Sequence, residues 1–249
     1  MRKLAKAMIP LLGAAVVVAG AVAASGATSA SASVRPTIIN GHPASEAYPL
    51  VYVGGCTGIL IKSQWALSAK HCGGPSSVRV GSLMQHSGGT VVSVSQTLGS
   101  PAADIELLHL SSAVSTVPYD VAQFSPAIGQ ATRIVGWGQT CPTPGCGGTP
   151  EKANELDTSV VADSKCQGID GPHELCTNNP NGNAGACYGD SGGPQLKKVT
   201  SGKWALVGIT SRSGNGDTTC ATGPSIYTDV TATDLRAWIA QTVGGLNNP

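Results

Sequence analysis

The sequence predicts an all-β protein. Gly, Ser, Thr and Val are frequent, and chain-breaking residues recur about every ten positions after the N-terminal segment. Short alternating or β-branched runs lie between these breakers, at 50–53, 78–80, 91–94, 133–135, 204–210 and 225–230. The sequence shows neither heptads nor tandem repeats. Closely spaced short strands of this kind are typical of β-sandwiches and β-barrels.

One long helical pattern stands out, at 233–243. Apolar residues follow helical spacing from Leu235 to Val243, and Thr231 or Thr233 could cap the start. A C-terminal helix is therefore expected after the last strand.

The N-terminal segment has the pattern of an export signal. Cations within residues 1–6 precede the apolar stretch 7–24, and the small residues at 30–32 form a cleavage site. We expect a signal peptide over 1–32 and a short propeptide over 33–37. A short membrane anchor is the alternative, but a proline and two glycines interrupt the apolar stretch. The mature protein is expected to be secreted and extracellular, without membrane contact.

The remaining chain is predicted to divide into two strand-rich parts. The stretch 111–129 contains two prolines and little alternation, which is typical of a linker. We place the parts at 38–117 and 131–249, with the linker at 118–130. Removal of the basic N-terminal segment leaves a weakly acidic chain, so a nucleic-acid partner is not expected.

Eight cysteines form an even set. In an exported chain such a set favours disulfides over zinc ligation. Only Cys141 and Cys146 have the spacing of a metal knuckle, but the prolines and glycine between them indicate a tight loop without a second Cys/His pair nearby. We expect four disulfides, no structural metal and no cofactor.

The most informative segment for function is 189–194, Gly-Asp-Ser-Gly-Gly-Pro. A nucleophilic serine, Ser191, needs neighbours without bulk and a backbone that can turn N–H groups toward a substrate oxygen. A chance glycine-rich turn is the alternative. His71 next to Cys72 could act as the base, and Asp104 opens an apolar run as a buried carboxylate would.

Together these segments resemble the chymotrypsin/trypsin family of serine proteases. The chain order is His, Asp, Ser, in Ala-x-His-Cys, Asp-Ile-x-Leu-Leu and Gly-Asp-Ser-Gly-Gly-Pro segments, and Gly-Trp-Gly stands at 136–138. The likeness runs from Ile38 onward. It implies two antiparallel six-stranded β-barrels with a C-terminal α-helix, and a secreted serine endopeptidase made as a zymogen. Ser191 would attack the scissile carbonyl, His71 would move the proton and Asp104 would orient His71.

The resemblance implies further site residues. Backbone N–H groups of Gly189 and Ser191 would form the oxyanion hole, and Ser211 would support the triad aspartate from behind. The freed amino group of Ile38 would pair with Asp190. Thr37 precedes Ile38 where a basic residue is usual. Processing by another protease, or in steps, is therefore expected.

The disulfide pairing is also implied by the resemblance. Three pairs take the family's bridge positions and the fourth is the pair that remains: Cys56 with Cys72, Cys166 with Cys176, Cys187 with Cys220, and Cys141 with Cys146.

By the same alignment, the primary specificity pocket has Gly185 at its base beside Ala186, with Ser213 and Ser225 on its walls. None of these is a carboxylate, so a buried substrate cation would be unpaired. We expect a neutral, small to medium residue at P1. Arg212 stands where the family has tryptophan, and it could favour acidic residues further along the peptide.

Two charges near the triad depart from the family pattern. Lys70 precedes the base, and Glu106 follows Asp104 by two residues, on the same strand face. We hypothesise an ion pair between Lys70 and Glu106, with two independent solvated charges as the alternative. The family's calcium loop would fall at 81–90, which holds no carboxylate, so calcium is not expected.

Two other functions fit part of the sequence. An α/β-hydrolase esterase would also contain Gly-x-Ser-x-Gly, but it needs a histidine after the serine and none follows Ser191. A catalytically silent protease-fold binding protein would be expected to lack a triad residue. The expected partners are protein or peptide substrates and a protein inhibitor, with the enzyme a monomer.

Overall fold

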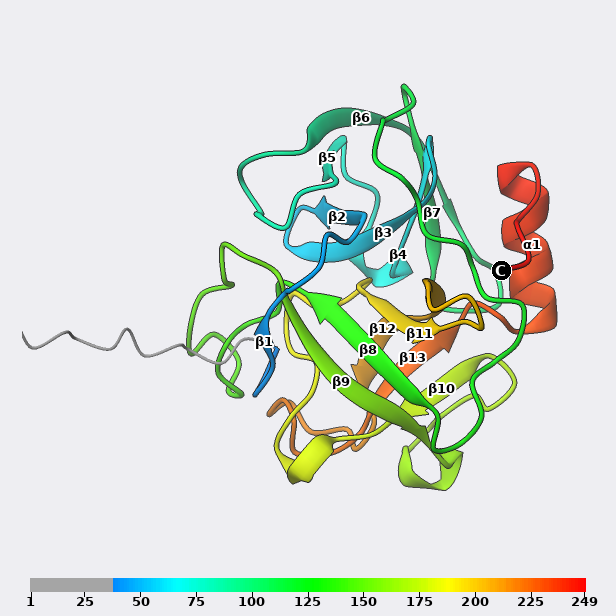
Figure 1. Cartoon of the computed structure of the whole chain (residues 1–249). Helices are drawn as coiled ribbons and strands as arrows, with labels where there is room; N and C mark the ends of the chain where they lie inside the picture. The colour runs from blue at the N-terminus through cyan, green and yellow to red at the C-terminus, as the bar shows by residue number, and fades with distance from the viewer. Residues whose placement is uncertain (1–37) are drawn as a thin grey trace, which may run out of the picture. The chain divides into compact units, whose positions relative to one another are not determined.

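Two closed antiparallel β-barrels, each of six strands, and a C-terminal helix make up the computed structural model, which describes residues 38–249 (Figure 1). The predicted all-β fold is therefore confirmed. The signal peptide and propeptide predicted within 1–37 lie outside the described residues. In the part of the chain that the structure describes, no helix has the length and apolar character needed to cross a membrane.

The first barrel closes in the order β2-β3-β4-β7-β6-β5. Its strands are β2 (Leu50–Val53), β3 (Cys56–Lys62), β4 (Trp65–Ser68), β5 (Ser77–Val80), β6 (Thr90–Gly99) and β7 (Glu106–Leu110). Branched aliphatic side chains such as Val51, Leu60 and Leu108 fill its interior. Burial of such side chains is the main force that closes the barrel.

The second barrel closes in the order β8-β9-β10-β13-β12-β11 through the pairing of β11 with β8. Its strands are β8 (Ala131–Gly136), β9 (Asn154–Val161), β10 (Glu174–Thr177), β11 (Pro194–Lys198), β12 (Trp204–Ser213) and β13 (Ser225–Asp229). A two-residue strand, β1 (His42–Pro43), adds to the edge of β9. The residues after Ile38 are thus attached to the second barrel.

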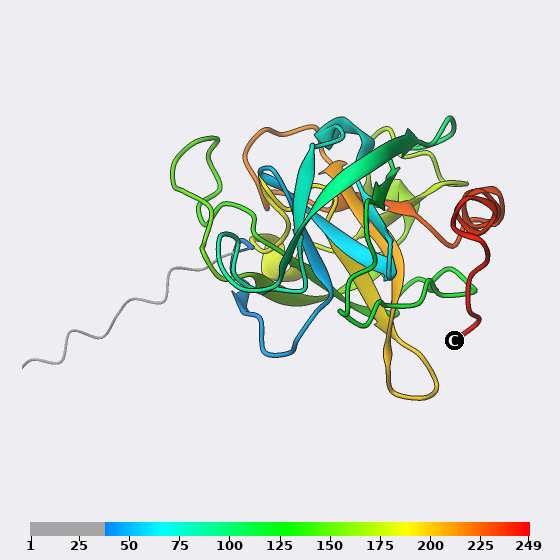
Figure 2. The same cartoon turned by 90° about the horizontal axis from the view of Figure 1, so that it is seen from above.

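The helix α1 (Thr233–Val243) has the predicted bounds and packs outside the barrels, with the C-terminus beside it (Figures 1 and 2). Buried Leu235 lies on its inner face. The predicted side-chain cap is wrong, because the N-cap residue is Ala232. Thr231 instead donates its hydroxyl to Asp229 at 2.5 Å, within the preceding turn.

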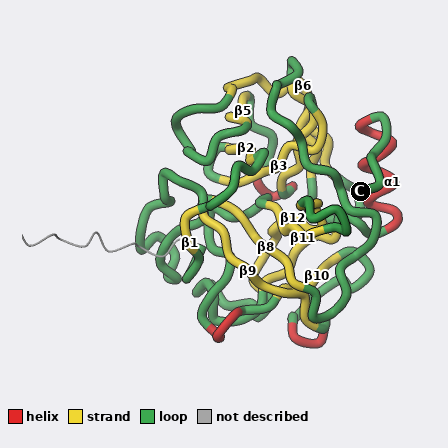
Figure 3. The backbone as a smooth tube through the Cα atoms, viewed as in Figure 1, coloured by secondary structure: helices red, strands yellow, loops and turns green. Residues whose placement is uncertain are grey.

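Apart from α1, the helical content of the described residues consists of three short 3₁₀ turns, and the rest is strand and loop (Figure 3). They are η1 (Lys70–Cys72), η2 (Asp163–Lys165) and η3 (Pro180–Gly182). The turn η1 directly follows β4 and carries the candidate base.

The barrels are tied together through buried Thr57 on β3. Its backbone N–H donates to the carbonyl of Ser191 at 2.9 Å, and its hydroxyl donates to the carbonyl of Gly189 at 2.8 Å. Thr228 on β13 donates to the carbonyl of Asp104 at 3.3 Å. These bonds hold the candidate nucleophile of one barrel against the candidate base and acid of the other.

Candidate active site

His71 and Asp104 are joined by two hydrogen bonds. Nδ1 of His71 lies 2.7 Å from Oδ2 of Asp104, and the backbone N–H of His71 donates to Oδ1 at 3.0 Å. The fold brings them together because β4 pairs antiparallel with β7, with Ser68 opposite Glu106. The turn after β4 therefore lies beside the loop before β7. A carboxylate held this way fixes the imidazole ring and leaves Nε2 free for a substrate-side proton.

The pKa values of the pair move apart. The hydrogen bond that the His71 ring donates to Asp104 raises the pKa of His71 above its ordinary value, although partial burial opposes this. Burial acts to raise the pKa of Asp104, but the hydrogen bonds from His71 and Ser211 together outweigh it and lower that pKa. Asp104 therefore remains a carboxylate through neutral pH, and His71 is more basic than a free imidazole.

Ser211 supports the same carboxylate from the far side. Its hydroxyl donates to Oδ2 of Asp104 at 2.7 Å, and its side chain is buried. Asp104 thus accepts hydrogen bonds from the first barrel and from β12 of the second. Both barrels therefore contribute to holding the candidate acid in one position.

Ser191 lies in a tight turn between Cys187 and Gly193. The backbone N–H of Asp190 donates to Cys187, and that of Gly193 donates to Asp190, at 2.9 and 2.8 Å. Gly192 has φ +79°, and a Cβ there would lie 2.2 Å from the carbonyl oxygen of Thr57. Only glycine allows the nucleophile turn to approach the first barrel this closely.

The N–H groups of Gly189 and Ser191 donate to no partner within residues 38–249. Gly189 adopts φ +102°, which L-residues rarely take. Two free donors beside a candidate nucleophile are the arrangement that stabilises a developing oxyanion. The Ser191 hydroxyl makes no hydrogen bond to His71 in the described part of the chain, although both side chains line one cavity. Catalytic bonds of this kind often tighten only when substrate binds.

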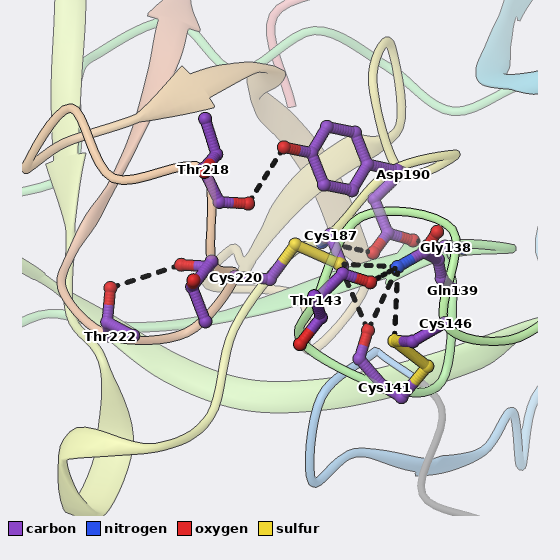
Figure 4. Close-up of a disulfide and its surroundings, with 12 residues drawn as sticks. Gly138, Gln139, Cys141, Thr143, Cys146, Cys187, Asp190, Thr218, Cys220 and Thr222 are labelled. Carbon is purple, nitrogen blue, oxygen red and sulfur yellow. Dashed lines mark hydrogen bonds between the residues drawn. A yellow bond between two sulfur atoms is a disulfide. The ribbon is translucent and has the colours of Figure 1, made fainter.

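Asp190 is buried against Gly136 and Gly138, in a position called here the Asp190 seat, and Figure 4 shows Asp190 beside Gly138. Its Oδ1 accepts the N–H of Gly138 at 2.7 Å, and its Oδ2 accepts the N–H of Cys187 at 2.9 Å. A Cβ on Gly136 or Gly138 would lie 2.3 or 2.0 Å from a carboxylate oxygen. Burial raises the pKa of Asp190 to about 7 against these two bonds. No cation lies within 4.0 Å of this carboxylate among the described residues. The seat therefore suits an incoming positive charge.

Ile38 is fully buried and packs in the core of the second barrel. Its neighbour Ile39 bridges Gly185, close to the turn that carries the nucleophile. The start of the described chain is thus near the loop in which Asp190 lies, as the expected activation pair requires.

A cavity of about 410 Å³ opens beside the hydrogen-bonded pair of His71 and Asp104. It is lined by His71, Ser191 and most of the predicted pocket residues, namely Ala186, Ser211, Arg212, Ser213 and Ser225. Gly185 lies behind this lining, where a Cβ would be 3.8 Å from the hydroxyl of Ser225. The predicted pocket residues therefore surround one cavity, except Gly185.

The four expected disulfides are all present, and the described residues contain no free cysteine. Cys187–Cys220 borders the cavity, and the small Cys141–Cys146 loop packs against it (Figure 4). Gln139 lies between them. Its amide donates to the carbonyls of Cys141 and Thr143, at 3.0 and 2.9 Å. This network braces the cavity wall.

Comparison with known proteins agrees with this geometry. The family model described as Trypsin matches residues 38–239. This chain belongs to the trypsin family.

Individual relatives agree. The chain is 30% identical over 234 residues to a trypsin-like protease of Streptomyces glaucescens, covering 86% of this chain and 85% of that protein. It is 33% identical over 218 residues to a fibrinolytic enzyme, isozyme C, of Lumbricus rubellus, covering 74% and 86%. Among solved structures, mouse neuropsin, described as a serine protease, matches with a TM-score of 0.70 and 26% identity, covering 83% of this chain and 100% of that one. The protein is a trypsin-family serine endopeptidase with protein or peptide substrates.

Several residues that line the cavity were missed by sequence reasoning, and two of them carry an ionisable side chain. Asp217 and Tyr188 both line the cavity. Asp217 is exposed, and the N–H of Thr219 and the hydroxyl of Thr222 hold its carboxylate at 2.8 and 3.0 Å. The first of these bonds leads in lowering the pKa of Asp217. Its place three residues before Cys220 was the available signal, because Cys220 is bonded to the pocket cysteine Cys187.

The prediction that Arg212 attracts acidic substrate residues is not supported. Its guanidinium already makes a two-pronged ion pair with Glu174 on β10, with Nη2 to Oε2 at 2.8 Å. Nη2 also donates to the carbonyl of Gly168 at 2.9 Å. The charge of Arg212 is thus neutralised within the second barrel. Its side chain forms part of the cavity wall.

The hypothesised pair between Lys70 and Glu106 is wrong. The Lys70 ammonium donates to the carbonyl of Ser100 at 2.9 Å, and these two side chains form no ion pair within 4.0 Å in the described residues. Lys70 extends instead over Gly99, whose Cβ would lie 3.0 Å from Cε of the lysine. Glu106 remains buried without this cation.

Proposed function

We propose that the enzyme hydrolyses peptide bonds through a catalytic triad of Ser191, His71 and Asp104. The observation that supports this most directly is the Asp104 carboxylate. It accepts a hydrogen bond from the His71 ring at 2.7 Å and another from Ser211 at 2.7 Å, beside a cavity that Ser191 also lines. A base oriented by a carboxylate next to a serine is the arrangement that nucleophilic acyl transfer needs.

In this mechanism the hydroxyl oxygen of Ser191 attacks the scissile carbonyl, and its proton moves to Nε2 of His71. The N–H groups of Gly189 and Ser191 then donate to the oxyanion of the tetrahedral intermediate. His71 returns the proton to the leaving amine, and water repeats the sequence to release the acyl group. Asp104 stabilises the imidazolium throughout and stays ionised, as its lowered pKa favours.

Labelling with an organophosphorus reagent tests the triad. We expect stoichiometric modification at Ser191 with complete loss of peptidase activity, and no labelling of the Ser191→Ala variant. A catalytically silent binding protein on the same scaffold would take up no label. Labelling at another serine with activity retained would contradict the assignment.

We also propose a neutral, small to medium P1 side chain. Ala186 and Ser225 line the cavity, and the atoms nearest to a Cβ at Gly185 would belong to Ser225 and Ala221, so none of these groups is a carboxylate. The acid that does line the cavity, Asp217, is exposed and held by its own loop. A buried substrate cation would lack a partner there.

Cleavage profiling against a peptide library measures this preference. We expect kcat/KM for Ala or Val at P1 to exceed that for Arg or Lys by about tenfold or more, the cost of about 1.4 kcal/mol or more for an unpaired buried charge. A preference for Arg or Lys would reject the proposal and would point to Asp217 as the partner of the cation.

Activation is proposed to follow release of Ile38 as a new N-terminus. A free amino group would supply the cation that the Asp190 seat lacks, and would hold that carboxylate ionised at neutral pH. Secretion of the precursor is inferred from the export pattern of residues 1–32.

A further inference from the structure

Glu106 is a buried carboxylate that the triad mechanism does not use. Only 2% of the residue is exposed, and its Oε1 is buried without any hydrogen-bond partner among residues 38–249. An unpartnered carboxylate at such a depth is costly to the fold. A residue kept there at that cost is a candidate for a role in the chemistry.

The strand register places Glu106 next to the dyad. Glu106 is the first residue of β7 and follows Asp104 by two positions. Across β4 it lies opposite Ser68, which precedes His71 by three residues, and across β6 it lies opposite Gly99. The barrel ladder therefore fixes its distance from the imidazole.

The charged and titratable groups around Glu106 are Asp104, His71 and Lys70. The strand neighbours on β4 and β6 are uncharged, and the Lys70 ammonium is bonded to the carbonyl of Ser100. Burial first, and the charge of Asp104 second, raise the pKa of Glu106 to about 7, while His71 lowers it. The charge of Glu106 in turn acts to raise the pKa of His71.

We propose that Glu106 is a positioning residue which, when ionised, stabilises the imidazolium that His71 becomes as Ser191 attacks. The inference rests on the proposed triad. The proton travels from the Ser191 hydroxyl to Nε2 of His71 and then to the leaving amine, and Glu106 receives none. Two carboxylates thus share one imidazolium, Asp104 through a hydrogen bond and Glu106 through space.

Direct titration of His71 tests the proposal without relying on activity. In a Ser191→Ala background, NMR follows the ring of His71 with and without Glu106→Gln, and the other four histidines serve as internal references: His42, His86, His109 and His173. Removing the carboxylate charge is expected to lower the His71 pKa by about 0.5 to 1 unit. An unchanged pKa would overturn the proposal.

The pH profile of the active enzyme gives a second measurement. Glu106→Gln is expected to move the acid limb of kcat/KM to lower pH by about 0.5 to 1 unit and to lower kcat above that limb about three- to tenfold, with KM unchanged. Glu106→Asp keeps the charge and should keep most of the wild-type limb. If both variants lower activity equally without moving the limb, Glu106 has only a structural role.

A matched control removes the same charge from the surface. Glu151 is exposed, and its only ion pair in the described residues is with exposed His86 at 3.9 Å. Glu151→Gln should leave the acid limb in place at about 0.15 M salt, because surface charges are screened over about 8 Å. An equal shift in this variant would overturn the role of Glu106.

The two proposals fail in different ways. An unmoved His71 pKa in the Ser191→Ala background rejects the role of Glu106 and leaves the triad intact. An enzyme that is neither labelled at Ser191 nor inactivated by the reagent rejects the triad itself.

Discussion

Replacing Asp104 with Asn is expected to lower kcat by about 10⁴-fold, the loss that the equivalent substitution causes in a serine protease with this triad. The amide keeps the shape of the carboxylate but presents an N–H group to Nδ1 of His71, where the structure has an acceptor at 2.7 Å. The imidazole is then held in the wrong tautomer, and its cationic form loses a compensating charge. KM should change little, because Asp104 lies outside the substrate cavity lining.

Ser211→Ala is the matched control for this result. It removes one hydrogen bond to the same Oδ2 atom and leaves the carboxylate in place. A hydroxyl that donates to an ionised carboxylate is worth about 1.5 to 3 kcal/mol, so kcat should fall by about ten- to 150-fold, well short of the loss expected for Asp104→Asn. Peptide hydrolysis at several pH values measures both variants. An Asp104→Asn enzyme with more than about a tenth of wild-type kcat would mean that another group orients His71.

Gly138→Ala is expected to lower kcat by at least about 100-fold, comparable with the loss of an oxyanion-hole donor. The new Cβ would lie 2.0 Å from Oδ2 and 2.3 Å from Cγ of Asp190, so the carboxylate must leave its seat. Asp190 directly precedes Ser191, and its displacement moves the N–H groups expected to bind the oxyanion. The overpacking should also lower the free energy of unfolding by about 1 to 3 kcal/mol.

Gly148→Ala is the matched control, because a Cβ at Gly148 meets nothing within 4 Å and its backbone is outside the left-handed region. That variant should keep activity within about twofold. N-terminal sequencing of both proteins must find Ile38 first, so that a defect in processing is not mistaken for a defect in the seat. Full activity of Gly138→Ala, or an active enzyme that begins elsewhere, would contradict the Asp190 seat and its pairing with Ile38.

The sequence was sufficient for the fold class and for the candidate triad, because those depend on short local segments. The sequence runs did not predict strands β3, β4, β7, β9, β10 and β11. For β3 and β7 the reason is physical. Their residues are buried almost throughout, so they show an apolar run without alternation. The helix was predicted well because its apolar spacing is local. Its cap was not, because the Thr231 hydroxyl donates to Asp229 in the preceding turn.

The contacts around the site that the sequence did not indicate join distant segments. Arg212 is paired with Glu174, 38 residues earlier, and only the pairing of β10, β13 and β12 brings them together. The Lys70 ammonium donates to the carbonyl of Ser100 and not to Glu106, because the lysine side chain passes over Gly99, which has no Cβ to block it. Neither outcome follows from spacing along the chain.

The attachment of the first described residues has a consequence for how activation is relayed. Ile39 bridges Gly185, β1 pairs with β9, and Ser45 and Tyr48 donate to Glu155 before the chain enters β2. A cut before Ile38 therefore acts on the half of the molecule that carries the nucleophile. The histidine and aspartate of the other half are already hydrogen-bonded in the uncut chain. Under the proposed activation, release of Ile38 would act on the Asp190 carboxylate and the turn that carries Ser191, whereas the hydrogen bond between His71 and Asp104 would need no rearrangement.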